Sequence, residues 1–231
     1  MSAPHAARQH ATVNAPASYP ADLQLDAPPE IANWRPLVQW ILAIPHLIIV
    51  NVLDNVSGVL ALVSWFIILF TGKLPEGIAR FQCLLIRYQA RAYSYAFFLR
   101  EQYPPFEFEM TTADPGTDPL RVDITPQLEN RNRLTVGLRI LWIIPILLFT
   151  AVVAIAAMVA MVVAFFATLF TGRWPESVRR FVLGAARLMV RTSVYGSLLT
   201  DEYPPFSLDA GVGAPRSPLA GGPGTLRPSA G

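Results

Sequence analysis

Six arginines stand in two patterns of equal spacing, 100 residues apart, on segments that are otherwise largely apolar. They are Arg80, Arg87, Arg91, Arg180, Arg187 and Arg191. At 3.6 residues per turn, the three arginines of each segment fall on one narrow edge of a helix. Arginines at a membrane–water boundary can bind lipid phosphates, so both edges are candidate sites for anionic phospholipid headgroups. The alternative is that they only hold the helix at the boundary and pair with carboxylates such as Glu76 and Glu176.

The remaining residue types offer no catalytic or metal-binding pattern. The three histidines, His5, His10 and His46, are too scattered for a metal cluster, and the single cysteine, Cys83, excludes an intrachain disulfide. No histidine accompanies the arginine segments to activate a nucleophile, and neither a G-x-S-x-G motif nor a phosphate-binding loop occurs. We therefore expect no enzyme activity, no cofactor and no metal.

Two ionisable residues, His46 and Asp54, interrupt the first apolar stretch of the chain. An ionisable group at such a position is a functional candidate by default. For His46 the alternative is a neutral histidine bonded to a backbone carbonyl that Pro45 frees. Neither residue has an equivalent 100 positions later, so an activity common to both halves cannot depend on them.

The arginine segments belong to an internal repeat. Residues 66–106 align without a gap on residues 166–206, and both copies end in Tyr-Pro-Pro-Phe, which we interpret as a structural turn. The chain is 53% hydrophobic and only 15% charged, against about 25% charged in soluble domains. Its net charge of +2 suggests no nucleic-acid partner. Together these features predict a duplicated membrane module.

Two windows almost free of charge precede the arginine segments. Asp54 is the one charged residue between Pro36 and Gly72, and there is none between Ile140 and Gly172. One spanning helix needs about 20 residues, so each window is long for a single crossing. A helical hairpin in each window keeps all flanking arginines on the cytoplasmic side. We therefore predict four membrane helices with turns at 51–55 and 150–154, either fully spanning or re-entrant, and both termini in the cytoplasm.

Between each window and its arginine helix lies a predicted elbow, Thr71–Glu76 and Thr171–Glu176. Gly72 and Gly172 suit a helix end, and the prolines three residues later suit the start of the next helix. The helices that follow are predicted over 75–100 and 175–200, and we expect them at the membrane–water boundary. Alternation of apolar and polar residues predicts short strands at 22–25, 106–110 and 120–124.

The predicted organisation has five parts. Residues 1–18 and 210–231 form disordered tails, 19–110 the first membrane module, 111–119 a linker and 120–209 the second module. The predicted fold class is an all-α membrane protein. Each module has a helical hairpin and an interfacial amphipathic helix, with minor cytoplasmic β-strands.

Several motifs are similar to those of a bacterial membrane family known as domain of unknown function 4389. They are Ile44-Pro45-His46, the segment Trp65–Gly72 ending in Leu-Phe-Thr-Gly, and Asp201–Leu208, which contains Tyr-Pro-Pro-Phe. The resemblance covers about residues 19–209 in two tandem copies. It implies a membrane protein but no reaction or ligand.

We expect a multi-pass protein of the cell membrane, a non-enzymatic scaffold or accessory subunit that contacts anionic phospholipid through the arginine helices. The alternative is a small transporter or channel subunit with a path between the two modules, for which the predicted spans carry few buried charges. Membrane phospholipids are the expected partners. The sequence leaves open a membrane-protein partner or a homo-oligomer.

Overall fold

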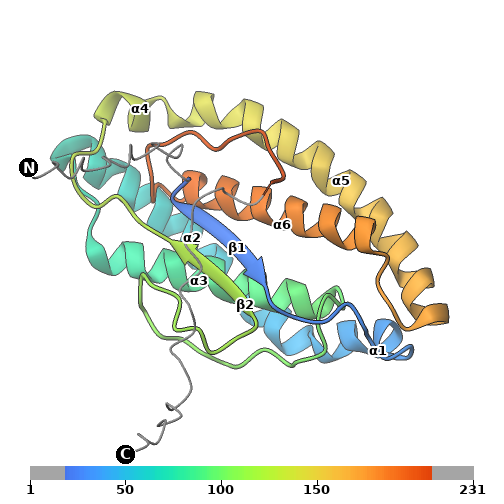
Figure 1. Ribbon diagram of the computed structural model, residues 1–231. Coiled ribbons are helices and arrows are strands. Elements are labelled where there is room, and N and C mark those ends of the chain that lie inside the picture. The colour runs from blue at the N-terminus through green and yellow to red at the C-terminus, as the bar shows by residue number, and fades with distance from the viewer. Residues whose placement is uncertain (1–18, 210–231) are drawn as a thin grey trace, which may run out of the picture. The chain divides into compact units, whose positions relative to one another are not determined.

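The computed structural model describes residues 19–209, and the predictions for the tails, 1–18 and 210–231, lie outside this range. The described chain is mostly helical with one small sheet, and the two halves contain the same elements in the same order (Figure 1). The first half comprises β1 (Ala21–Leu25), α1 (Arg35–Leu42), α2 (Ile44–Thr71) and α3 (Glu76–Ala96). The second comprises β2 (Leu120–Ile124), α4 (Arg133–Gly137), α5 (Arg139–Thr171) and α6 (Glu176–Gly196).

The predicted helical hairpins are not present in the described residues, because each apolar window forms one long continuous helix after a short one. The predicted turn at 51–55 lies inside α2, where the Asn55 side-chain amide donates to the Asn51 carbonyl oxygen at 2.7 Å. The side-chain amide of Gln89 in α3 lies 3.4 Å from the Asp54 carboxylate. These polar side chains therefore find hydrogen-bond partners within α2 and on α3, and no turn is needed to accommodate them. The predicted turn at 150–154 likewise falls inside α5.

Both predicted elbows are confirmed. Gly72 and Gly172 adopt left-handed φ angles of 72° and 67°, which end α2 and α5 and favour glycine. The arginine helices α3 and α6 then begin at Glu76 and Glu176, whose carboxylates lie at the positive helix ends. Both helices end four residues before the predicted limits.

The strands of the two halves pair with each other in an antiparallel sheet. Asp22 lies opposite Asp123 and Leu23 opposite Val122, so the ladder is unchanged when each residue is exchanged for the one 100 positions away. β1 packs on α6 and β2 on α3 (Figure 1). Each strand therefore packs on the arginine helix of the other half, and the two modules are interlocked.

Backbone hydrogen bonds repeat this exchange at the elbows. The Ile31 amide donates to the Gly172 carbonyl oxygen at 2.9 Å, and the equivalent Arg131 amide donates to the Gly72 carbonyl oxygen at 3.2 Å. The segment ahead of the first helix of each module thus binds the elbow of the other module. The main hydrophobic core lies between the sheet and the arginine helices and includes Leu23.

The predicted strand at 106–110 is not present; this segment has no regular secondary structure. Its side chains are used differently. Glu107 binds Arg91 at 3.0 Å, and the Phe108 ring stacks on Tyr88 with centroids 5.3 Å apart. The alternation of apolar and polar residues at 106–110 therefore arises from contacts with α3, and this segment joins no sheet.

Candidate functional site

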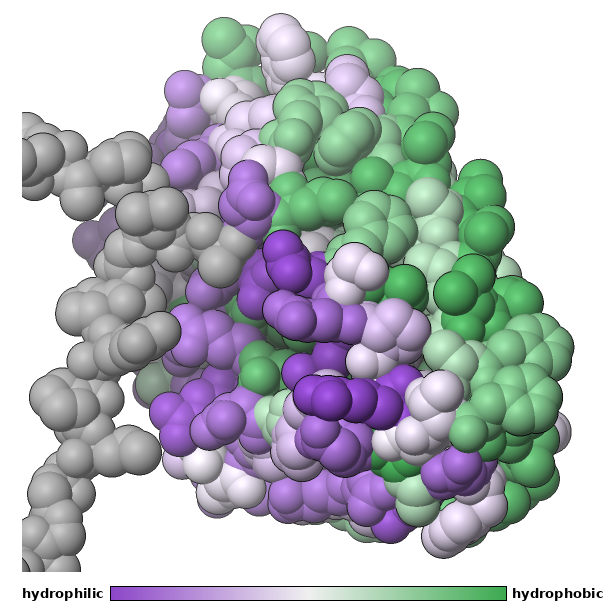
Figure 2. Space-filling model, turned by 45° about the vertical axis from the view of Figure 1, so that its right-hand side comes forward, coloured by the Kyte–Doolittle hydropathy of each residue, from purple (hydrophilic) through white to green (hydrophobic). Residues whose placement is uncertain are grey.

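The most prominent surface feature is an apolar face that runs along α2 and α5. We define it by residues spaced three, four or seven apart in each half, all at least 42% exposed and all in α2 or α5 except Ile41, which lies at the end of α1. They are Ile41, Ile44, Ile48, Val52, Val59, Leu62, Phe66 and Phe70, and Leu141, Ile144, Leu148, Val152, Val159, Val162, Phe166 and Phe170. Figure 2 shows apolar residues covering one side of the molecule and polar residues the other. A continuous apolar surface of this kind marks a binding face for membrane or protein.

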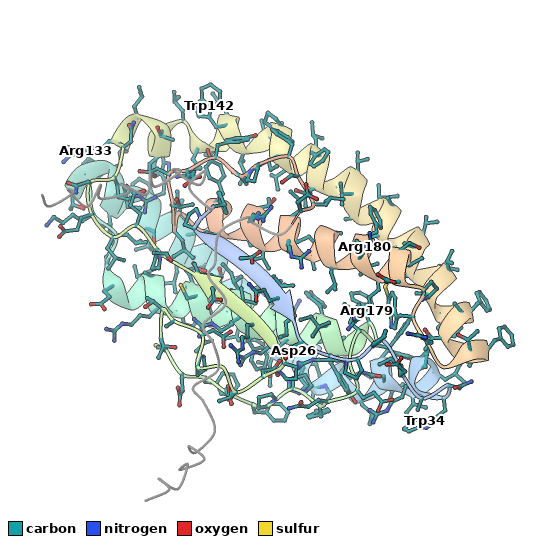
Figure 3. The ribbon with its side chains drawn as sticks, viewed as in Figure 1. Asp26, Trp34, Arg133, Trp142, Arg179 and Arg180 are labelled. Carbon is teal, nitrogen blue, oxygen red and sulfur yellow. The ribbon has the colours of Figure 1, made fainter. Side chains whose placement is uncertain are left out.

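Only a narrow stripe of residues on the opposite side of each long helix is buried in the protein. In α2 only His46, Val50, Ser64 and Ile68 are buried among 28 residues. Both long helices are apolar and long enough to cross a membrane, judged by length and composition alone. Exposed tryptophans add to the apolar residues: Trp34, ahead of α1, and Trp142, near the start of α5, are each 54% exposed and point outward in Figure 3.

A groove of about 430 Å³ opens on this side between α1, α3 and α5. Its walls are apolar and include Trp40 of α1, Phe97 beyond the end of α3, and Phe165 of α5. The groove brings residues of both halves together.

Two of the arginines of α3, Arg87 and Arg91, lie inside the molecule. Arg87 donates to the carbonyl oxygens of Thr111 and Thr112 at 2.8 and 3.1 Å. Arg91 binds Glu107 and Asp114, each at 3.0 Å. The guanidinium-bearing side chains of both arginines are 4–5% exposed.

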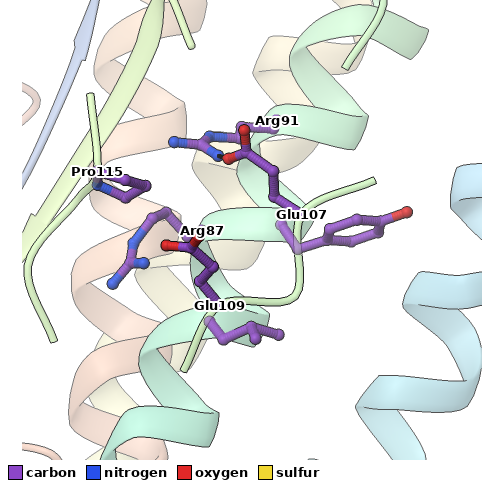
Figure 4. Close-up of a pocket in the computed structure, with 7 residues that line it drawn as sticks. Arg87, Arg91, Glu107, Glu109 and Pro115 are labelled. Carbon is purple, nitrogen blue, oxygen red and sulfur yellow. Dashed lines mark hydrogen bonds and ion pairs between the residues drawn. The ribbon is translucent and has the colours of Figure 1, made fainter. Parts of the chain in front are cut away.

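A small cavity of about 10 Å³, the size of one water molecule, lies beside these arginines (Figure 4). Arg87, Arg91, Glu107, Glu109 and Pro115 line it together with two residues of α3. Burial lowers the pKa of Arg87, and Asp114 opposes this shift. The arrangement is an ion-pair network beside a space the size of about one water molecule.

Arg187 and Arg191 of α6 are also held by contacts inside the molecule. Arg187 donates to the Leu23 carbonyl oxygen at 2.9 Å, and Arg191 donates to the Asp209 carbonyl oxygen at 2.9 Å. The Asp22 carboxylate of β1 lies 3.9 Å from both. These two side chains therefore fasten the exchanged strand β1 to α6.

Arg80 and Arg180 are the two predicted headgroup residues that reach the surface. Each forms an ion pair one turn back along its helix, with Glu76 at 2.5 Å and Glu176 at 3.2 Å. The side chains are 48% and 75% exposed. The structure thus divides the six arginines into four that hold the fold and two that face outward.

Two further arginine clusters were missed because their partners are distant in sequence or fall in the predicted linker. Arg100 forms a buried ion pair with Asp118. Arg131 and Arg139 both bind the Asp201 carboxylate, at 2.8 and 3.0 Å. The sequence offers only the excess of arginine near each module as a signal for these pairs.

His46 is fully buried between α2 and α3. Its Nδ1 atom lies 2.7 Å from the Tyr88 hydroxyl oxygen, and its ring stacks on Phe106 at 4.3 Å. In the second half Ile146 takes this place and is also fully buried. The Tyr-Pro-Pro-Phe segment at 103–106 therefore covers a position on the long helix that can be polar or apolar.

No group of three His, Cys, Asp or Glu residues within 19–209 could hold a metal ion. Comparison with known proteins found one family whose model matches this chain twice, at residues 33–107 and 133–207. That family is described as a domain of unknown function (DUF4389). No curated protein and no solved structure matches the chain.

Proposed function

We propose that this chain, which belongs to the DUF4389 family, is a membrane protein that acts as a non-enzymatic scaffold or accessory subunit in contact with anionic phospholipid. The observation that supports this proposal is the apolar face, which is built in the same way in both halves. Exposed apolar residues on this scale are unfavourable in water and favourable in lipid. We place the protein at the cell membrane with the elbows, the arginine helices and both termini on the cytoplasmic side.

We assign the contact with anionic headgroups to the exposed residues Arg80 and Arg180. Their pairing with Glu76 and Glu176 does not prevent it, because exposed ion pairs contribute only about 0–1 kcal/mol. A basic residue near an anionic surface contributes about 1 kcal/mol. The four inner arginines support this function indirectly by holding the two modules together.

Flotation with lipid vesicles tests the proposal. We expect the detergent-purified chain, after detergent removal, to float with anionic vesicles. Val59→Asp with Val159→Asp puts one carboxylate on the apolar face of each long helix, where a charge in lipid costs about 2.5–3.5 kcal/mol on insertion scales. This double variant should bind at least about 100-fold more weakly.

The matched control is Gln24→Asp, an exposed position on the strand side. It should bind vesicles as the wild type does. Equal flotation of the double variant and the wild type would refute the role of the apolar face.

A second candidate is a small transporter or channel subunit. Polar pairs between α2 and α3 favour it: His46 with Tyr88, and Ser57 with Gln82 at 2.5 Å. Solute flux in proteoliposomes tests this candidate, and flux that is unchanged by His46→Ala would count against a path along these pairs.

A further inference from the structure

In each half, the long helix packs on the arginine helix, and the arginine helix packs on a strand of the sheet. In the first half the Ser57 hydroxyl donates to the Gln82 side chain, which joins the centres of α2 and α3. Farther along α3, Arg91 donates to the Leu120 carbonyl oxygen of β2 at 3.4 Å. The structure is therefore layered, with α2 on the apolar side, α3 in the middle and β2 on the polar side.

The second half repeats these layers. Thr150 of α5 and Thr192 of α6 are joined by a hydroxyl hydrogen bond of 2.9 Å. Arg187 of α6 in turn binds the Leu23 carbonyl oxygen of β1 at 2.9 Å. The sheet and the two long helices thus lie on opposite sides of the layer formed by α3 and α6.

This layering conflicts with a crossing of the membrane by α2 or α5. A helix of 28 residues is about 42 Å long, and the hydrocarbon core is about 30 Å thick. If α2 stood across the bilayer, β2 would lie within the hydrocarbon core beside it. Arg121 and Asp123 of β2 and Gln24 of β1 are exposed, and lipid offers such groups no partner.

An orientation with the long helices parallel to the surface removes this conflict. The apolar face then enters the lipid over its whole length, and the sheet stays in water. The packing of α1 on α5 and of α4 on α2 places the two long helices in the same layer with opposite chain directions (Figure 1). The exchange symmetry of the strand ladder then relates the halves about the membrane normal.

We propose that α2 and α5 lie in the plane of the membrane, that the apolar face is embedded in one leaflet, and that no segment of residues 19–209 reaches the far surface. The partner of this surface is the hydrocarbon of a single leaflet. The inference rests on the proposed membrane association and replaces the crossing helices predicted from sequence with a one-sided attachment.

Depth measurements with spin labels test this proposal on the full chain in vesicles. In a Cys83→Ala background, single cysteines are placed at Ile48, Val59 and Phe70, which are 61%, 64% and 73% exposed. Accessibility to oxygen and to a water-soluble nickel chelate gives the depth of each label. A label at Arg121, on the exposed side of β2, is the aqueous reference.

In the proposed orientation the three labels on α2 lie at equal depth, within about 5–10 Å of the headgroup boundary. The label at position 121 stays in water. In a crossing orientation, labels at 48 and 70 are separated by about 33 Å along the helix and lie near opposite surfaces, with the label at 59 near the centre. That gradient would overturn the in-plane orientation and leave the membrane proposal standing.

Vesicle binding by the same labelled chains separates the two proposals. If none of the labelled chains binds vesicles, the membrane association itself is wrong, and the in-plane orientation is wrong with it. The matched labels at Leu148, Val159 and Phe170 must give the same depths as those of α2, since the two halves present the same face. Unequal depths along α5 would also contradict the proposal.

Discussion

Replacing Asp114 by asparagine should destabilise the protein strongly, because this carboxylate compensates the buried arginines of α3. The Asp114 side chain is 2% exposed, binds Arg91 at 3.0 Å and lies 3.9 Å from Arg87. It also accepts hydrogen bonds from the backbone amides of Gly116 and Val122 at 2.8 and 2.9 Å. Asparagine keeps the shape and removes the charge. Breaking a buried ion pair in this way costs about 3–5 kcal/mol.

The single cysteine supplies the assay. Cys83 is fully buried, and burial raises the pKa of its thiol to about 11, so the folded protein should react slowly with alkylating reagents. If labelling requires opening of the fold, a loss of about 4 kcal/mol should speed it by roughly 1,000-fold in detergent solution. Circular dichroism melting of the same samples separates unfolding from a local change in thiol reactivity.

The control is Glu129→Gln, which breaks the exposed ion pair with Lys73 and should change stability by about 0–1 kcal/mol. Labelling of the Asp114→Asn variant at a rate within tenfold of this control, with an unchanged melting temperature, would refute the structural role of the inner arginines.

Three further predictions concern other parts of the molecule. His46→Ile places the residue of the second half, Ile146, in the first and should change stability by less than about 1.5 kcal/mol in thermal melts, since the site is apolar in one copy already; a loss above about 3 kcal/mol would contradict this. Arg80→Gln with Arg180→Gln should weaken binding to anionic vesicles roughly 30-fold, from about 1 kcal/mol each, and leave melting and binding to neutral vesicles unchanged; equal binding to anionic vesicles would remove the headgroup contact. Burial raises the pKa of Cys83 to about 11, so between about pH 9 and 11 the folded state keeps the thiol proton that the unfolded state loses. The stability of the wild type should therefore fall relative to that of Cys83→Ala by up to about 1.4 kcal/mol per pH unit in this range. Equal dependence of stability on pH in the two proteins would contradict this.

Local signals in the sequence predict the elbows and the arginine helices well. Gly72 and Gly172 fit the left-handed end of a helix, and the proline and glutamate that follow fit the start of the next one. These features depend on a few neighbouring residues, so the sequence displays them directly. The strands at 120–124 and near 22–25 are predicted as elements for the same reason, but their pairing with each other leaves no local trace.

The hairpins and the place of the arginines depend on tertiary contacts that the sequence does not display. Asn51, Asp54 and Asn55 favour a turn in isolation, yet Gln89 of α3 provides a partner for Asp54 and the helix continues. The arginine edge predicts an exposed stripe only if nothing acidic covers it. Asp114 does cover it, from a segment whose composition predicts a linker.

The role of the apolar face is tested most directly by quenching of tryptophan fluorescence with brominated lipids. Trp34, Trp40 and Trp142 are 54%, 55% and 54% exposed, whereas Trp174 is 2% exposed in the interior. In vesicles whose acyl chains carry bromine, we predict strong quenching of the wild-type chain and little quenching after the three exposed tryptophans are replaced by phenylalanine. Equal fractional quenching of the wild type and of this triple variant would show that lipid does not contact the apolar face.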